Sequence, residues 1–273
     1  MRGLSAVVLA VLTLGVSLAA SCSQSRPAER SPNTITFVAA EYAFTGPMEV
    51  TSGLTTIVLL NSGKEIHWLE MYRLAEEKDM NDFRRLLQDT RLTGKIPPWL
   101  SAVGGPGWIP PQDTSNVTSY LTPGQYVLVC RFPSADRIPH STKGMVESVR
   151  VTDPTKPPDP EPQDDVVLTI SDTAFSFSRP LRAGSQTLRV ENVGSYRHEV
   201  YLFQLAPGKS IQDYRAWEDG GLKGVGPGRP RGGVTPFEPG QRAWFTVFFE
   251  PGEYVFGDET WEGPVLFRQV TVR

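Results

Sequence analysis

The residues of this chain that could do chemistry are a lone cysteine and a few histidines. The sequence contains two cysteines and three histidines. Cys22 lies just after the apolar N-terminal run of an expected secretory signal, and if the Cys22 thiol is modified there, Cys130 is left without a disulfide partner. An exported thiol without such a partner is either an inert buried side chain or a metal ligand. The choice between these two decides which function the sequence predicts.

Cys130 ends a motif that has a known counterpart. Residues 123–130 (PGQYVLVC) are followed by His140, by residues 143–145 (KGM) and by a valine-rich segment, and residues 61–67 (NSGKEIH) lie upstream. This arrangement resembles the copper loop of the cupredoxin family, which includes plastocyanin and azurin. There a cysteine ends one strand, and a histidine and a methionine follow in the next loop. The resemblance implies one type 1 (blue) copper ion with the ligands His67, Cys130, His140 and Met145.

The donor types agree with that implication. Two imidazoles, a thiolate and a weak thioether suit an ion that cycles between Cu(I) and Cu(II), because soft sulfur ligands hold Cu(I). Zinc would favour a harder ligand or another thiolate over a thioether. Nine residues separate Cys130 from His140, a longer loop than in plastocyanin and nearer to that of copper nitrite reductases, and Trp68 and Arg131 each follow a ligand position. The alternative is a copper-free sandwich with Cys130 buried and His67 structural.

The chain contains two copies of one unit. Residues 41–89 align with residues 172–220 at a constant offset of 131, and further matches follow at offsets of 128 and 121. At the four ligand positions the second copy has His198, Asp258, Trp261 and Leu266. We expect Asp258 to be paired with an arginine or exposed. The second copy keeps one ligand of four and is therefore predicted to bind no copper.

The elements that must position these residues are short strands. Runs of β-branched and aromatic residues between Gly, Pro, Asn and Ser predict strands at residues 34–39, 55–60, 67–73, 117–121, 126–130 and 146–151, and at residues 166–170, 186–191, 199–205, 243–249, 254–256 and 267–272. One short helix is expected in each copy, at residues 80–88 and 211–219. Short strands with turns between them predict an all-β fold. With the resemblance, they imply two tandem cupredoxin-like Greek-key β-sandwiches, each with a short inserted helix.

The N-terminal residues are predicted to lie outside the fold. An apolar run, residues 4–20, leads to Ala19-Ala20-Ser21-Cys22, which resembles the bacterial lipobox and implies cleavage before Cys22 and its acylation. An ordinary signal peptide is the alternative. We expect a signal peptide (1–21), a lipid-anchored tether (22–33), a copper domain (34–153), a Pro- and acid-rich linker (154–165) and a copper-free domain (166–273). The chain would then face the periplasm or the cell exterior from a bacterial membrane.

The composition narrows the function further. A net charge of −3 and the lack of a basic block argue against nucleic acid as a partner. Three histidines are too few for the additional copper centre of a multicopper oxidase or a nitrite reductase, so we expect no enzyme. The leading hypothesis is one-electron transfer with redox protein partners near the membrane. The alternatives are a copper-free binding or scaffold module at the cell surface and a copper storage or delivery protein.

Overall fold

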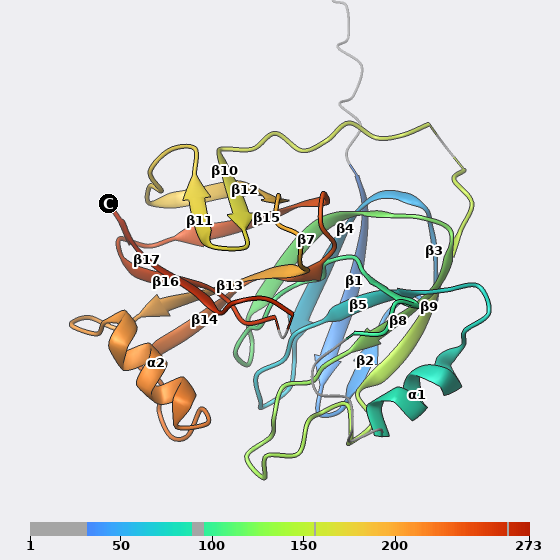
Figure 1. The fold of residues 1–273 in the computed structure, drawn as a ribbon, viewed down its shortest axis with the longest axis horizontal. Helices are drawn as coiled ribbons and strands as arrows, with labels where there is room; N and C mark the ends of the chain where they lie inside the picture. The colour runs from blue at the N-terminus through green and yellow to red at the C-terminus, as the bar shows by residue number, and fades with distance from the viewer. Residues whose placement is uncertain (1–31, 89–95, 156, 261) are drawn as a thin grey trace, which may run out of the picture. The chain divides into compact units, whose positions relative to one another are not determined.

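The computed structural model describes residues 32–88, 96–155, 157–260 and 262–273 (Figure 1). They belong to one compact unit that spans Ser31–Arg273. The expected signal peptide and Cys22 lie outside the described residues. Within the described ranges, no helix is long and apolar enough to span a bilayer.

The first copy folds into two facing sheets. Its elements are β1 (Asn33–Ala40), β2 (Ala43–Thr45), β3 (Glu49–Thr51), β4 (Gly53–Asn61), β5 (Glu70–Leu74), α1 (Met80–Gln88), β6 (Leu100–Ala102), β7 (Thr114–Leu121), β8 (Gly124–Val129) and β9 (Val146–Thr152). The strands β2-β1-β4-β7 form part of one sheet, and β3-β9-β8-β5-β6 form the other. Alternate side chains of both sheets, such as Ile57, Leu59 and Leu128, share one buried core. This is a β-sandwich.

The second copy repeats this arrangement except for β3, which has no counterpart among its described residues. Its elements are β10 (Val166–Ser171), β11 (Ala174–Phe177), β12 (Gly184–Asn192), β13 (His198–Leu205), α2 (Ile211–Asp219), β14 (Gly228–Phe237), β15 (Arg242–Phe249), β16 (Gly252–Asp258) and β17 (Leu266–Val272). The orders β11-β10-β12-β15 and β14-β13-β16-β17 match β2-β1-β4-β7 and β6-β5-β8-β9 of the first copy. The predicted all-β fold of two tandem β-sandwiches with one short helix each is confirmed.

The two copies meet through equivalent strands. β7 and β15 pair antiparallel around Thr118 and Trp244, which makes β11-β10-β12-β15-β7-β4-β1-β2 one eight-stranded sheet (Figure 1). Residues 103–107 run against β14, and the Gly107 amide donates to the Gly233 carbonyl at 3.1 Å. A Cβ on Gly107 would lie 2.8 Å from the backbone of Gly232, so this close approach requires glycine.

The strands β2, β3, β6, β11 and β14 were not predicted, and the bounds of several other strands differ from the sequence prediction. β5 begins at Glu70 instead of residue 67, because His67 leaves the sheet and pairs only with Ile109 in an isolated bridge. β8 ends at Val129, so Cys130 lies just beyond the strand. β14 was not predicted, because its sequence GRPRGGVTPF has the composition of a loop. Gly233 has a φ of +116°, and a Cβ there would lie 1.9 Å from the Val200 carbonyl oxygen, so the strand needs this glycine.

Candidate metal centre

The loop after β4 positions His67. Asn61 is fully buried, and its side chain donates to the Glu65 carbonyl at 2.8 Å and to the Ile109 carbonyl at 3.1 Å, while its Oδ1 accepts from the Gly63 amide at 2.9 Å. The backbone of His67 exchanges two hydrogen bonds with Ile109, at 3.2 and 2.9 Å. The hydrogen bonds of the Asn-x-Gly turn and of Ile109 therefore fix the backbone position of His67.

The loop between β8 and β9 positions the other predicted ligands. The Cys130 amide donates to the Met145 carbonyl at 3.2 Å, and the Met145 amide donates to the His140 carbonyl at 3.0 Å. The His140 amide donates to the Phe132 carbonyl at 2.9 Å. The side chains of Cys130, His140 and Met145 are fully buried. Backbone hydrogen bonds thus link all three positions directly, although the loop is long.

Three of the four predicted ligands present donor atoms to one point. His67 Nδ1 and His140 Nδ1 are 3.1 Å apart, and Cys130 Sγ lies 3.9 Å from the first and 3.4 Å from the second. A triangle with these sides has a circumradius of about 2.0 Å, close to the length of a metal–nitrogen bond. Among the described residues this is the group of His, Cys, Asp and Glu side chains that could hold a metal ion.

The protonation of the group fits a cation. Burial, together with the neighbouring His140, lowers the pKa of His67 to about 4, so its imidazole is neutral and has a lone pair to donate. Burial raises the pKa of the Cys130 thiol to about 12. A thiolate in this pocket therefore needs a positive charge beside it, and a bound metal ion would supply that charge. The donor set and its surroundings fit a metal ion.

Met145 is the fourth predicted ligand. It is fully buried in the core that also contains Cys130, and its backbone lies between those of Cys130 and His140 in the hydrogen-bond pattern. Its role as a weak sulfur ligand stays a prediction.

The surroundings of the group include residues that the sequence did not single out. His140 Nε2 lies 2.7 Å from Glu65 Oε2, and the Tyr42 ring packs edge-on against His140 with a centroid distance of 5.3 Å. The guanidinium of Arg131, which follows Cys130 in the sequence, is bound to buried Glu70, with Nε 2.9 Å from Oε2. Its charge is therefore compensated within the protein.

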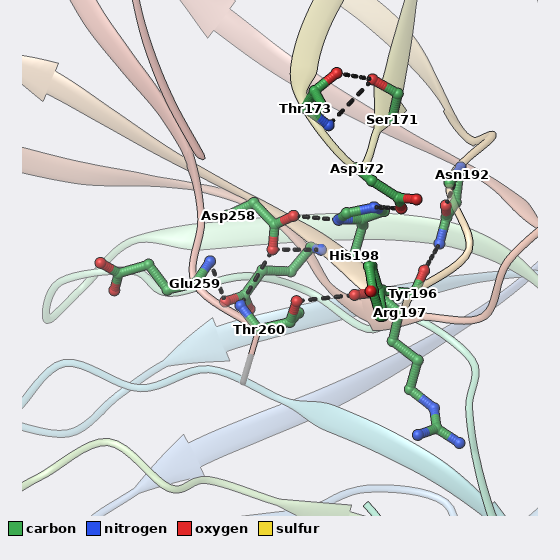
Figure 2. A network of polar contacts seen from close by, with 12 residues as sticks. Ser171, Asp172, Thr173, Asn192, Tyr196, Arg197, His198, Asp258, Glu259 and Thr260 are labelled. Carbon is green, nitrogen blue, oxygen red and sulfur yellow. Dashed lines mark hydrogen bonds and ion pairs between the residues drawn. The ribbon is translucent and has the colours of Figure 1, made fainter. Parts of the chain in front are cut away.

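The corresponding point of the second copy holds an ion pair (Figure 2). His198 Nδ1 contacts Asp258 Oδ2, and His198 Nε2 lies 3.1 Å from Asp172 Oδ1. Asp258 Oδ1 also accepts from the Glu199 and Thr260 amides, at 3.3 and 3.2 Å. Burial opposes protonation of His198, but its hydrogen bonds to the two aspartates raise its pKa overall.

The expectation for Asp258 was wrong. Asp258 is fully buried, where we expected an exposed side chain or an arginine partner, and its partner is the histidine that the second copy retains. Leu266, at the position of Met145, lies at the start of β17 opposite Asp258. Trp261, at the position of His140, lies outside the described residues.

Comparisons with known proteins give structural matches alone. No family model matches the chain, and no curated protein matches it. The solved structures that match include a multicopper oxidase (14% identity, 91% of each chain, TM-score 0.28) and the reduced auracyanin of Roseiflexus castenholzii (16%, 45% of this chain and 99% of that one, TM-score 0.30). The copper nitrite reductase of Nitrosomonas europaea also matches (12%, 89% and 94%, TM-score 0.24). Because these identities and TM-scores are low, the evidence for a metal centre is the geometry of the three donor side chains alone.

Proposed function

We propose that this chain is an extracytoplasmic type 1 copper protein that transfers single electrons. The observation that carries the proposal is the buried triangle of His67 Nδ1, His140 Nδ1 and Cys130 Sγ. Two imidazoles and a thiolate, with Met145 as a weak fourth ligand, are the donors that suit copper in both oxidation states. Copper, when bound there, would supply a one-electron couple.

The protein's own part in this function is to keep the donors in place. The His67 backbone is bonded to Ile109, and the backbones of Cys130, His140 and Met145 are bonded to one another. Since all four side chains are fully buried, neighbouring atoms also restrict their rotamers. A pocket held in this way changes little between oxidation states, which favours fast electron exchange.

A carrier fits the histidine inventory better than an enzyme does. The sequence contains three histidines, of which two belong to the triangle, and His198 is bound to Asp258 and Asp172. None is left to build a second, catalytic copper centre. In this proposal residues 34–153 form the copper domain, residues 154–165 the linker and residues 166–273 a copper-free domain, with Cys22 lipidated and redox proteins as partners outside the cytoplasm.

Loading the full chain with Cu(II) tests the proposal. We expect the intense visible absorption of a thiolate-to-copper transition, and Cys130→Ser should abolish it. Cys22→Ser is the matched control, because it removes the other cysteine and leaves the sequence of residues 32–273 unchanged, so the absorption should persist. A chain that stays colourless and copper-free would contradict the proposal in favour of a scaffold module. Bound copper that exchanges electrons slowly with every donor would favour storage or delivery.

A further inference from the structure

The outer nitrogen of His140 has a partner that reaches solvent. His140 is fully buried, and the side chain of Glu65, 2.7 Å from its Nε2, is 30% exposed. A carboxylate can only accept hydrogen bonds, so the ring must carry a proton on Nε2. Nδ1, which lies 3.4 Å from Cys130 Sγ, is then free to donate its lone pair. This contact therefore selects the tautomer that the triangle needs.

The second copy indicates that Glu65 belongs with His140. At the offset of 131, the position of Glu65 is occupied by Tyr196, and the second copy also lacks the counterpart of His140. Another acid, Glu41, aligns with Asp172 and is therefore present in both copies. Glu41 accepts from the Lys64 amide, just as Asp172 accepts from the Ser195 amide, so this acid serves the loop in either copy. A carboxylate at the position of Glu65 is therefore found only in the copy that also has a histidine at the position of His140.

We propose that Glu65 is a positioning residue of the metal centre, which holds His140 with Nδ1 toward the cluster and stabilises the more highly charged state of the bound ion. The inference rests on the proposed copper function. A carboxylate that accepts from a ligand imidazole makes that imidazole a stronger donor. The negative charge of Glu65 also favours Cu(II) over Cu(I). Solvent screens this attraction only weakly, because His140 lies buried between the carboxylate and the ion site.

The tautomer can be tested without any metal. Nitrogen-15 NMR of the metal-free full chain should show His140 with a proton on Nε2 that is protected from exchange and with Nδ1 bare. Glu65→Leu should remove the protection and populate the other tautomer, whereas Glu41→Gln should leave His140 unchanged. A His140 ring protonated on Nδ1 in the wild type, or a Glu65→Leu spectrum identical to the wild type, would overturn the proposal.

The reduction potential gives the second readout. Glu65→Gln keeps a hydrogen-bond acceptor but removes the charge, so the affinity for Cu(II) relative to Cu(I) should fall about tenfold, or ~59 mV for a one-electron couple. Glu65→Leu should also weaken Cu(II) binding by roughly 10- to 100-fold. Glu41→Gln is the matched control because it removes the same charge from the neighbouring β1–β2 turn, whose Glu41 accepts from the Lys64 amide, without touching His140.

The outcomes separate the two proposals. An equal shift in Glu41→Gln and Glu65→Gln would mean that a general charge effect acts, and the positioning role would be rejected. A wild-type chain that binds no copper would contradict the proposed function, while the NMR result would still decide the role of Glu65.

Discussion

His67 and His198 occupy equivalent places in the two copies, at the end of the same Asn-x-Gly loop. His67 faces another histidine and a thiol, and burial with that neighbour lowers its pKa to about 4. His198 faces Asp258 and Asp172, whose hydrogen bonds raise its pKa against the effect of burial. The same buried point therefore holds a neutral donor group in one copy and a charged pair in the other.

The difference between the two copies concerns how a buried negative charge at this position is balanced. In both copies a side chain at the end of β8 or β16 can carry a negative charge into a buried site, as a Cys130 thiolate or as the Asp258 carboxylate. A positive charge is then needed to balance it. In the second copy a proton on His198 provides that charge, and in the first copy we propose that a metal ion does.

The largest effect is expected when the first copy is converted toward the second. Cys130→Asp should eliminate the visible absorption of the copper-loaded chain. It should also weaken copper binding by more than the roughly 100-fold that loss of an outer partner causes, because the soft donor itself is removed. Visible absorption and competitive copper titration measure both quantities. Copper affinity that stays within about tenfold of the wild type would show that the thiolate is not a ligand, since even outer partners have effects of that size.

Breaking the ion pair of the second copy should have the next largest effect. Asp258→Asn removes one partner of a fully buried pair, and we expect the free energy of unfolding to fall by about 3–5 kcal/mol. Asp172→Asn is the control. Asp172 is 32% exposed and binds the other ring nitrogen, so its substitution should reduce the free energy of unfolding much less than Asp258→Asn does. Denaturant unfolding of the metal-free chain measures both, and equal losses would refute the distinction.

The two histidines should also titrate on opposite sides of the ordinary value of about 6.5. In the metal-free chain, His67 should stay neutral down to about pH 4, and His198 should stay protonated above pH 6.5. The stability that His67 contributes is then lost as pH falls from about 6.5 toward 4, and that of His198 is lost as pH rises through its raised pKa. NMR titration of the ring protons measures each pKa, and a common value near 6.5 would contradict the comparison.

The linker should contribute least. Glu161, in the predicted linker, binds both Tyr120 of β7 and Arg242 of β15, and all three side chains are partly exposed. Exposed ion pairs contribute about 0–1 kcal/mol. Glu161→Gln should therefore change the free energy of unfolding by less than about 1 kcal/mol. A larger loss, measured by denaturant unfolding, would mean that the linker holds the two copies together.

Features set by local chemistry could be predicted from the sequence. Both helices have the predicted bounds, and a side-chain cap marks the start of each. Asp79 accepts from the amides of residues 81 and 82 at the start of α1, and Ser210 and Asp213 form a capping box at the start of α2. The duplication followed from the constant spacing of matching residues, and the three converging donor residues were expected from the resemblance of residues 61–67 and 123–145 to a known copper loop. Each of these signals lies within a short segment or in a repeat of one.

Features set by distant contacts could not be predicted. Glu65 binds His140 across 75 positions, and Asp258 binds His198 across 60, so nothing near either acid identifies its partner. β14 shows the same limit, because its glycine-rich sequence is a strand only where β13 lies beside it. For such residues the sequence gives the donor or acceptor, and the fold selects its partner.

The pairing of β7 with β15 should protect the chain from self-association through exposed edge strands. A strand at the end of a sheet leaves backbone amides and carbonyls open to a second molecule. Here each of these two strands covers the other's open side, and the Asn116 side chain adds two hydrogen bonds to the Thr246 backbone, at 2.8 and 3.0 Å. A chain that stopped at residue 153 would expose β7. It should therefore aggregate more readily than the full chain, even with its metal centre intact.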